Sequence, residues 1–174
     1  MADVRHGVKA DPAIVKTIVW PTEAATKSFA QALAAQPALH KAFIELHGGL
    51  GAGKTSFVRH LLQALGVLGR IKSPTYAVVE SYELADTTPP LAVWHFDFYR
   101  FNDPNEWEDA GFRDIFASPG LKLAEWPVNA AQHLPRADWV MQIDVLPDES
   151  RQLTVTAQTE LGVALLQGSL GALV

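Results

Sequence analysis

The chain has 174 residues, a formal net charge of −5 and no cysteine, and 48% of its residues are hydrophobic. This length and apolar fraction are typical of one globular domain with a sizeable core. The lack of cysteine excludes disulfides, thiolate metal sites and cysteine nucleophiles. The acidic balance argues against a broad basic face that would hold nucleic acid by phosphate contacts alone. With no apolar signal core and no run near the ~18 apolar residues of a membrane span, we expect a cytoplasmic protein that makes no membrane contact.

The first half of the chain predicts an arm and a helix, and after them a strand, a loop and a second helix. Residues 1–17 are polar and irregular, so a flexible arm is expected there. Residues 22–33 predict a helix, with Thr22 as its N-cap and alanines in its first turns. A strand is expected at 42–47, then a glycine-rich loop, and then a helix at 55–65 that Gly66 ends.

The second half is richer in strand signals. Residues 76–84 and 91–99 predict two strands, and the short loop between them requires an antiparallel pair. Asp103 and Pro104 mark a helix start. A short buried strand is expected at 121–125, and a second hairpin at 139–145 and 151–157. Residues 159–174 are apolar without a clear period, so we expect a tail there and a domain over residues 18–158.

The stretch HGGLGAGKTSF, residues 47–57, carries the strongest chemical signal. From Gly48 to Thr55 it matches the phosphate-binding pattern G-x-x-x-x-G-K-[ST]. Such a loop turns backbone N–H groups inward as an anion nest, and glycines let the backbone approach phosphate oxygens. Lys54 would reach the β- and γ-phosphates, and the Thr55 hydroxyl would bind Mg²⁺. The alternative is a glycine-rich turn that only caps a helix, but the predicted strand before it and helix after it favour nucleotide binding.

Two acids at strand ends are candidates to complete such a site. Asp97 ends one predicted strand and Glu125 ends another, where a magnesium-side acid or a water-orienting acid is expected. The alternatives are an edge-strand aspartate facing water and a surface glutamate. Thr75 follows Ser73 and Pro74 where nucleotide-switch loops carry a threonine, although a plain turn would have the same sequence. His95 is interpreted as a packing or surface histidine.

Four motifs in this order and spacing resemble the bacterial TsaE family, formerly called YjeE. They are residues 48–55, residues 71–76 (IKSPTY), residues 95–100 (HFDFYR) and residues 125–127 (EWP). The start of the first helix, EAAT at residues 23–26, is also similar, and the resemblance covers about residues 18–155. It implies a P-loop NTPase-like α/β domain whose central sheet mixes parallel and antiparallel strands and is flanked by helices.

The resemblance also implies an activity. The family members are P-loop ATPases that bind ATP or ADP with Mg²⁺ and hydrolyse ATP slowly alone. They act with the TsaB–TsaD pair, with TsaD the expected contact, in making threonylcarbamoyladenosine at position 37 of tRNA. This chain is accordingly expected to reach tRNA only through its partners and to be a monomer when alone.

Residue roles are carried over from the family motifs position by position. The catalytic residues implied are Lys54, Glu125 and Thr75. Thr55 and Asp97 would hold the metal, and Glu23 would lie near the nucleoside. The full set implied for nucleotide binding is Glu23, Gly48, Gly51, Ala52, Gly53, Lys54, Thr55, Ser56 and Glu125. The chain departs from the family at Gly49, where an aspartate is usual, which puts the pre-ordering of the loop in question.

Two other functions are compatible with the same loop. A small-molecule kinase would need an acceptor pocket under an arginine-bearing lid, and no insertion of lid length stands out in the sequence. A nucleotide-binding adaptor without turnover would look much like a slow ATPase. Trp107, among acidic residues, is either a partner anchor or a core-facing side chain of a solvated helix.

Overall fold

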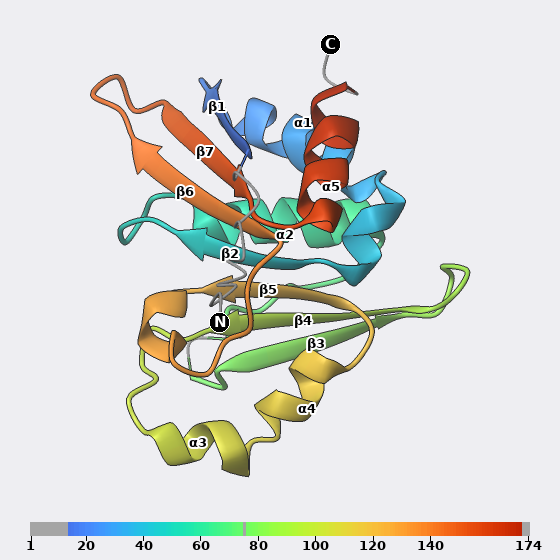
Figure 1. The fold of residues 1–174 in the computed structure, drawn as a ribbon. Helices are drawn as coiled ribbons and strands as arrows, with labels where there is room; N and C mark the ends of the chain where they lie inside the picture. Colours follow the sequence, from blue (N-terminus) through green and yellow to red (C-terminus); the bar gives the residue numbers. More distant parts are fainter. Residues whose placement is uncertain (1–13, 75, 172–174) are drawn as a thin grey trace, which may run out of the picture.

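A computed structural model describes residues 14–74 and 76–171 of the chain. Within these residues seven strands form one sheet, in the order β1-β7-β6-β2-β5-β4-β3, with helices on both of its faces (Figure 1). The expected α/β class with a mixed sheet is confirmed. None of the helices in the described ranges is long and apolar enough to cross a lipid bilayer.

The elements follow the predicted order closely. The strands are β1 (Ile14–Trp20), β2 (Phe43–His47), β3 (Val79–Leu84), β4 (Leu91–Asp97), β5 (Leu121–Glu125), β6 (Trp139–Val145) and β7 (Arg151–Ala157). The helices are α1 (Glu23–Ala34), α2 (Lys54–Leu65), α3 (Pro104–Asp109), α4 (Phe112–Ala117) and α5 (Glu160–Gly171), with 3-10 turns η1 (Pro37–Lys41) and η2 (Pro127–Ala130). The strand expected from residue 76 begins at Val79, because the N–H of Val78 closes a turn onto the Pro74 carbonyl at 2.7 Å.

The centre of the sheet is parallel and its flanks are antiparallel. β2 lies between β5 and β6 and runs parallel to both, and β4 runs parallel to β5. The pairs β1–β7, β6–β7 and β3–β4 are antiparallel, so both expected hairpins are present. The carboxyl ends of β2, β4 and β5 therefore meet at one edge of the sheet, which is where ligands bind in folds of this kind.

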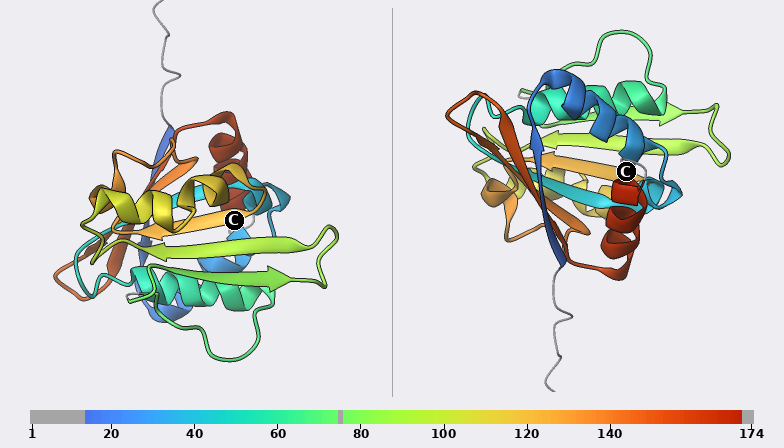
Figure 2. Two further views of the ribbon diagram at one scale, coloured as in Figure 1. Left: turned by 90° about the horizontal axis from the view of Figure 1, so that it is seen from below. Right: turned by 90° about the horizontal axis from the view of Figure 1, so that it is seen from above.

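Two hydrophobic cores lie on opposite faces of the sheet. Helices α1, α2 and α5 cover one face, and α3 and α4 cover the other, as the views from above and below show (Figure 2). Successive side chains of a strand alternate between the faces. On β4, Leu91 and Val93 belong to the core under α2, whereas Phe96 belongs to the opposite core. His95 and Asp97 share the face of Leu91 and Val93, so the α2 side of the sheet receives both polar side chains.

The domain begins earlier than the sequence predicts. Residues 14–17, placed in the expected arm of residues 1–17, belong to β1 and pair with residues 154–157 of β7. β1 is an edge strand whose side chains are mostly exposed, with only Trp20 buried. A strand that buries so little carries no visible alternation of apolar and polar residues. Residues 1–13 lie outside the described part of the chain.

The expected tail at 159–174 is wrong as far as residue 171, because α5 occupies this segment. Leu165 and Leu166 are buried in the core shared with α1 and α2. A Cβ on Gly162 would lie 2.2 Å from the Asp138 carbonyl oxygen, so glycine lets α5 approach the start of β6. There the indole N–H of Trp139 donates to the Gly162 carbonyl at 2.8 Å. Residues 172–174 lie outside the described part.

Candidate functional site

The glycine loop connects the end of β2 to the start of α2. Gly48, Gly51 and Gly53 have φ of 152°, 75° and 109°, a region that side chains other than hydrogen rarely allow. At Gly48 a Cβ would also meet the Ile143 carbonyl oxygen at 2.6 Å. The first N–H groups of α2 have no partner within the helix, and Gly53, its N-cap, has no side chain to satisfy them. This loop and helix start therefore form an anion site.

Lys54 is the first residue of α2 and is 5% exposed. Its ammonium donates to the carbonyl oxygens of Gly48 and, at 3.3 Å, of Gly49. It also lies 3.9 Å from the centroid of the Trp126 ring, a cation–π contact. Burial lowers the pKa of Lys54, and the negative charges of Glu125 and Asp97 oppose that shift. The structure thus places a partly desolvated cation beside the loop.

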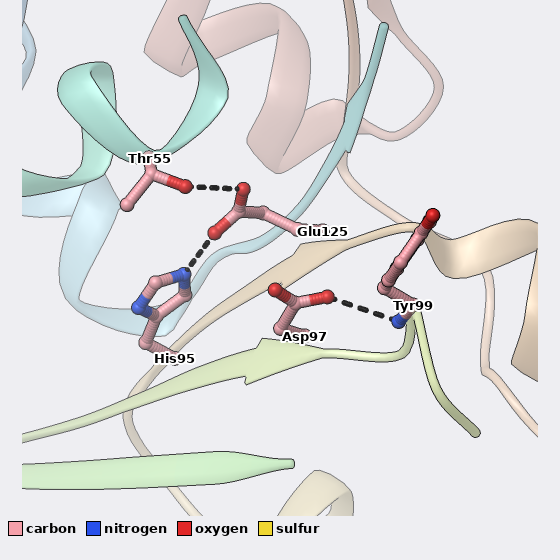
Figure 3. Close-up of polar contacts among 5 residues, drawn as sticks. All are labelled: Thr55, His95, Asp97, Tyr99 and Glu125. Atoms are coloured by element: carbon pink, nitrogen blue, oxygen red, sulfur yellow. Dashed lines mark hydrogen bonds and ion pairs between the residues drawn. The ribbon is translucent and has the colours of Figure 1, made fainter. Parts of the chain in front are cut away.

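Glu125 is only 2% exposed, which rules out the alternative of a surface charge. Its Oε1 accepts a hydrogen bond from the Thr55 hydroxyl at 2.8 Å, and its Oε2 lies 2.6 Å from His95 Nε2 (Figure 3). Asp97 is 6% exposed rather than facing water, and its Oδ1 accepts from the Tyr99 backbone N–H at 2.9 Å. Glu125 therefore contacts the start of α2 through Thr55, and Asp97 lines the same cavity as both residues.

Of the two alternatives predicted for His95, a packing or a surface histidine, the structure excludes the surface one. His95 is fully buried and contacts the Glu125 carboxylate through Nε2. The sequence did indicate the side of the sheet on which His95 lies. His95 is two residues before Asp97, so the two side chains share one face of the strand.

Two adjoining cavities flank the loop. The first, of about 250 Å³, is lined by Trp20, Pro21, Thr22, Glu23, Thr26, Ala52, Gly53, Ser56, Glu149 and Arg151. The second, of about 330 Å³, is lined by Leu50, Gly51, Ala52, Gly53, Lys54, Thr55, Ser56, Ser73, Asp97, Tyr99, Glu125 and Trp126. Ala52, Gly53 and Ser56 line both cavities, so one elongated ligand could occupy the two together.

The structure adds two wall residues that sequence reasoning missed. The Arg151 Nε donates to the Ala52 carbonyl at 2.9 Å and so ties the start of β7 to the loop. Glu149, with φ of 66°, lies beside it in the turn between β6 and β7. These residues lie about a hundred positions from the loop in the sequence, and no local pattern links the two segments.

Three further residues were singled out from the sequence: Glu23, Thr75 and Trp107. Glu23 lines the first cavity, and its Oε1 lies 3.1 Å from His60 Nε2. Thr75, expected to be catalytic and part of a switch segment, lies outside the described residues. Trp107 is 5% exposed and packs in the core beneath α3 and α4, which is the core-facing alternative.

The sheet order, the glycine loop and the strand-end acids together define a P-loop nucleotide-binding protein. The family described as threonylcarbamoyl adenosine biosynthesis protein TsaE matches residues 20–153. The chain belongs to this TsaE family.

Individual relatives agree with this assignment. The chain is 40% identical to the tRNA threonylcarbamoyladenosine biosynthesis protein TsaE of Haemophilus influenzae, over 78% of this chain and 83% of that protein. It is 35% identical to the TsaE of Bacillus subtilis, over 66% of this chain and 68% of that protein. In fold it resembles the crystal structure of Bacillus subtilis YdiB, with a TM-score of 0.73, 24% identity and coverage of 93% and 98% of the two chains.

Proposed function

We propose that this chain is a slow ATPase that serves tRNA threonylcarbamoyladenosine formation at position 37. It would bind ATP or ADP with Mg²⁺ in the cytoplasm, as a monomer when alone, and be stimulated by a TsaB–TsaD heterodimer through which it reaches tRNA. The observation that carries the proposal is the meeting of Lys54, Thr55 and Glu125 at the start of α2, in a chain of the TsaE family.

The phosphates would lie against the loop in the second cavity. Backbone N–H groups of residues 48–56 and the helix start supply donors without side-chain reorganisation. Lys54 supplies a point charge, and its contacts to two loop carbonyls keep it beside the loop until phosphate oxygens compete for it.

The donor set suits magnesium. The Thr55 hydroxyl gives its one proton to Glu125, so its oxygen lone pairs point elsewhere and are available to a cation. Asp97 lines the same cavity and adds a carboxylate. Magnesium is commonly held by one or two such protein groups together with phosphate oxygens and waters. When bound, it would neutralise charge that develops on the transferring phosphoryl group.

The nucleoside would occupy the first cavity. That cavity adjoins the loop through Ala52, Gly53 and Ser56, and Glu23 forms part of its wall. Glu125, buried and fixed between two hydrogen bonds, would orient the attacking water. Thr75 stays a proposed switch residue, to be tested by substitution.

Reconstitution tests this proposal. Purified chain, TsaB, TsaD, tRNA, ATP and a preformed activated threonylcarbamoyl donor are combined, and both phosphate release and the modified nucleoside are measured. We expect both to require this chain and to be lost with Lys54→Met. Modified nucleoside without phosphate release would favour an adaptor without turnover. Phosphoryl transfer to a small molecule would favour the kinase, an alternative to which the family membership lends no support.

A further inference from the structure

A chain of three side chains, two of them buried and the third half-buried, connects β4, β5 and α2. His95 Nε2 contacts Glu125 Oε2 at 2.6 Å, and Glu125 Oε1 accepts from the Thr55 hydroxyl at 2.8 Å (Figure 3). Glu125 and Thr55 line the second cavity, whereas His95 does not. His95 therefore reaches the cavity only through the carboxylate in front of it.

The register of the sheet explains this contact. His95 pairs with Leu123 and Asp97 pairs with Glu125, so His95 and Glu125 are diagonal neighbours on the same face of adjacent strands. His95 is fully buried, so water does not compete for the carboxylate from that side.

The contact with Glu125 also selects one tautomer of the His95 imidazole ring. Nε2 faces a carboxylate oxygen, which only accepts hydrogen bonds, so Nε2 must carry a proton. Nδ1 is buried, and no group in the described part of the chain hydrogen-bonds to it. A proton at Nδ1 would be a buried donor without an acceptor, which is costly. The neutral ring protonated at Nε2 satisfies both conditions.

We propose that His95 is a positioning residue that fixes the Glu125 carboxylate for the hydrolytic step. This inference rests on the role of Glu125 in the proposed function. The last torsion of a glutamate side chain is broad, so one bond to Thr55 alone leaves the carboxylate free to turn. A second bond, from the opposite side, holds both oxygens. Hydrogen bonds that orient metal ligands from outside typically change activity by about 10- to 100-fold, and we expect an effect on this scale for the bond that orients Glu125.

Three substitutions separate positioning from packing. His95→Gln places an amide N–H the same number of bonds from Cβ as Nε2, so it restores the bond to Glu125. His95→Asn places its amide at the Nδ1 position, and this amide does not reach the Glu125 carboxylate. His95→Phe fills the space without a donor. If His95 only packs, Phe should substitute best; if it positions Glu125, Gln should.

The measurements are partner-stimulated ATP hydrolysis, nucleotide affinity from Trp126 fluorescence, and thermal unfolding. We expect His95→Phe and His95→Asn to lower kcat by on the order of 10-fold with nucleotide affinity retained, and His95→Gln to recover most of the loss. In a Glu125→Gln background, His95→Phe should lower kcat no further, because the two act as one unit. Equal kcat in Phe and Gln variants, or additive losses in the double variant, would overturn the inference.

A readout without turnover keeps this inference separate from the proposed function. Long-range ¹H–¹⁵N NMR spectra of the unsubstituted chain should show His95 protonated at Nε2 only, and Glu125→Leu should shift that resonance. Protonation at Nδ1, or no response to Glu125→Leu, would overturn the positioning role whether or not the chain hydrolyses ATP. Absent hydrolysis with the expected NMR result would contradict the proposed ATPase and leave the His95–Glu125 bond established.

Discussion

Two adjacent glycines of the loop differ in whether the structure has room for a side chain. Gly48 has φ of 152°, and an added Cβ would lie 2.6 Å from a backbone oxygen of Ile143. Gly49 has no left-handed φ, and an added Cβ would meet open space. We expect Gly48→Ala to lower the free energy of unfolding by about 1–3 kcal/mol. Gly49→Ala should leave it unchanged or raise it by up to about 1 kcal/mol.

Urea denaturation of the two variants measures this difference directly. The same geometry predicts that Gly49→Asp folds normally, because a Cβ at this position meets open space. Equal stability of the two alanine variants would contradict the packing described at Gly48.

Lys54 should lower the stability of the fold at neutral pH while it strengthens nucleotide binding. Its pKa is lowered by burial, so over the pH range between that lowered value and 10.5 the unfolded chain binds more protons than the folded one. Stability contributed by this group therefore rises as pH rises through that range, and the charged lysine destabilises the fold at neutral pH. Lys54→Met should raise the free energy of unfolding at pH 7, flatten its rise as the pH approaches 10.5, and abolish tight nucleotide binding.

Lys122 supplies the matched control. It is also buried with a pKa lowered by burial, but it donates to the Ser118 carbonyl on the opposite face of the sheet. Lys122→Met should leave nucleotide affinity unchanged in isothermal titration. Loss of affinity in both lysine variants would mean that Lys54 acts through overall stability rather than at the phosphates.

The candidate site was predictable where a short local pattern specifies it. The loop motif located Lys54 and Thr55, and the ends of predicted strands located Asp97 and Glu125. Arg151 was not predictable, because its bond to Ala52 depends on how distant strands order in the sheet. His95 lay between these cases: its face of the strand could be inferred, but not that a glutamate on the next strand would meet it.

Among the elements, α5 was the largest error of the sequence analysis, and its packing explains why. It buries Leu165 and Leu166 against α1 and η1, while two glycines permit close approach to its neighbours. Such a helix is apolar on much of its surface and shows little amphipathic period. Prediction from period alone therefore fails, although the helix completes the core.

Helix α5 should accordingly be essential to the fold. Leu165 is fully buried, and Leu165→Ala should lower the free energy of unfolding by about 2–5 kcal/mol. Gln167, two residues along and exposed, provides the comparison: Gln167→Ala should change it by no more than about 0.5 kcal/mol. Similar small effects of both changes, measured by urea denaturation, would return this segment to the status of a dispensable tail.

At the scale of the whole molecule, the order of the strands in the sheet brings the site residues together. β2 sits between β5 and β6, and β4 lies beyond β5, so three parallel strands deliver the loop, Asp97 and Glu125 to one edge. The sequence predicted the mixed sheet only through family resemblance, since strand order depends on contacts between distant segments. The antiparallel hairpins, by contrast, followed from short connections alone.

The most direct test of the account is a paired measurement on Glu125→Gln, which removes the charge and retains the shape. Nucleotide binding, followed by Trp126 fluorescence, should survive because the loop amides and Lys54 supply most of the phosphate contacts. Partner-stimulated hydrolysis should fall by roughly 10²-fold, about 2.7 kcal/mol of barrier. Unchanged hydrolysis would contradict the catalytic role of Glu125, and loss of binding together with hydrolysis would make it a nucleotide or metal ligand instead.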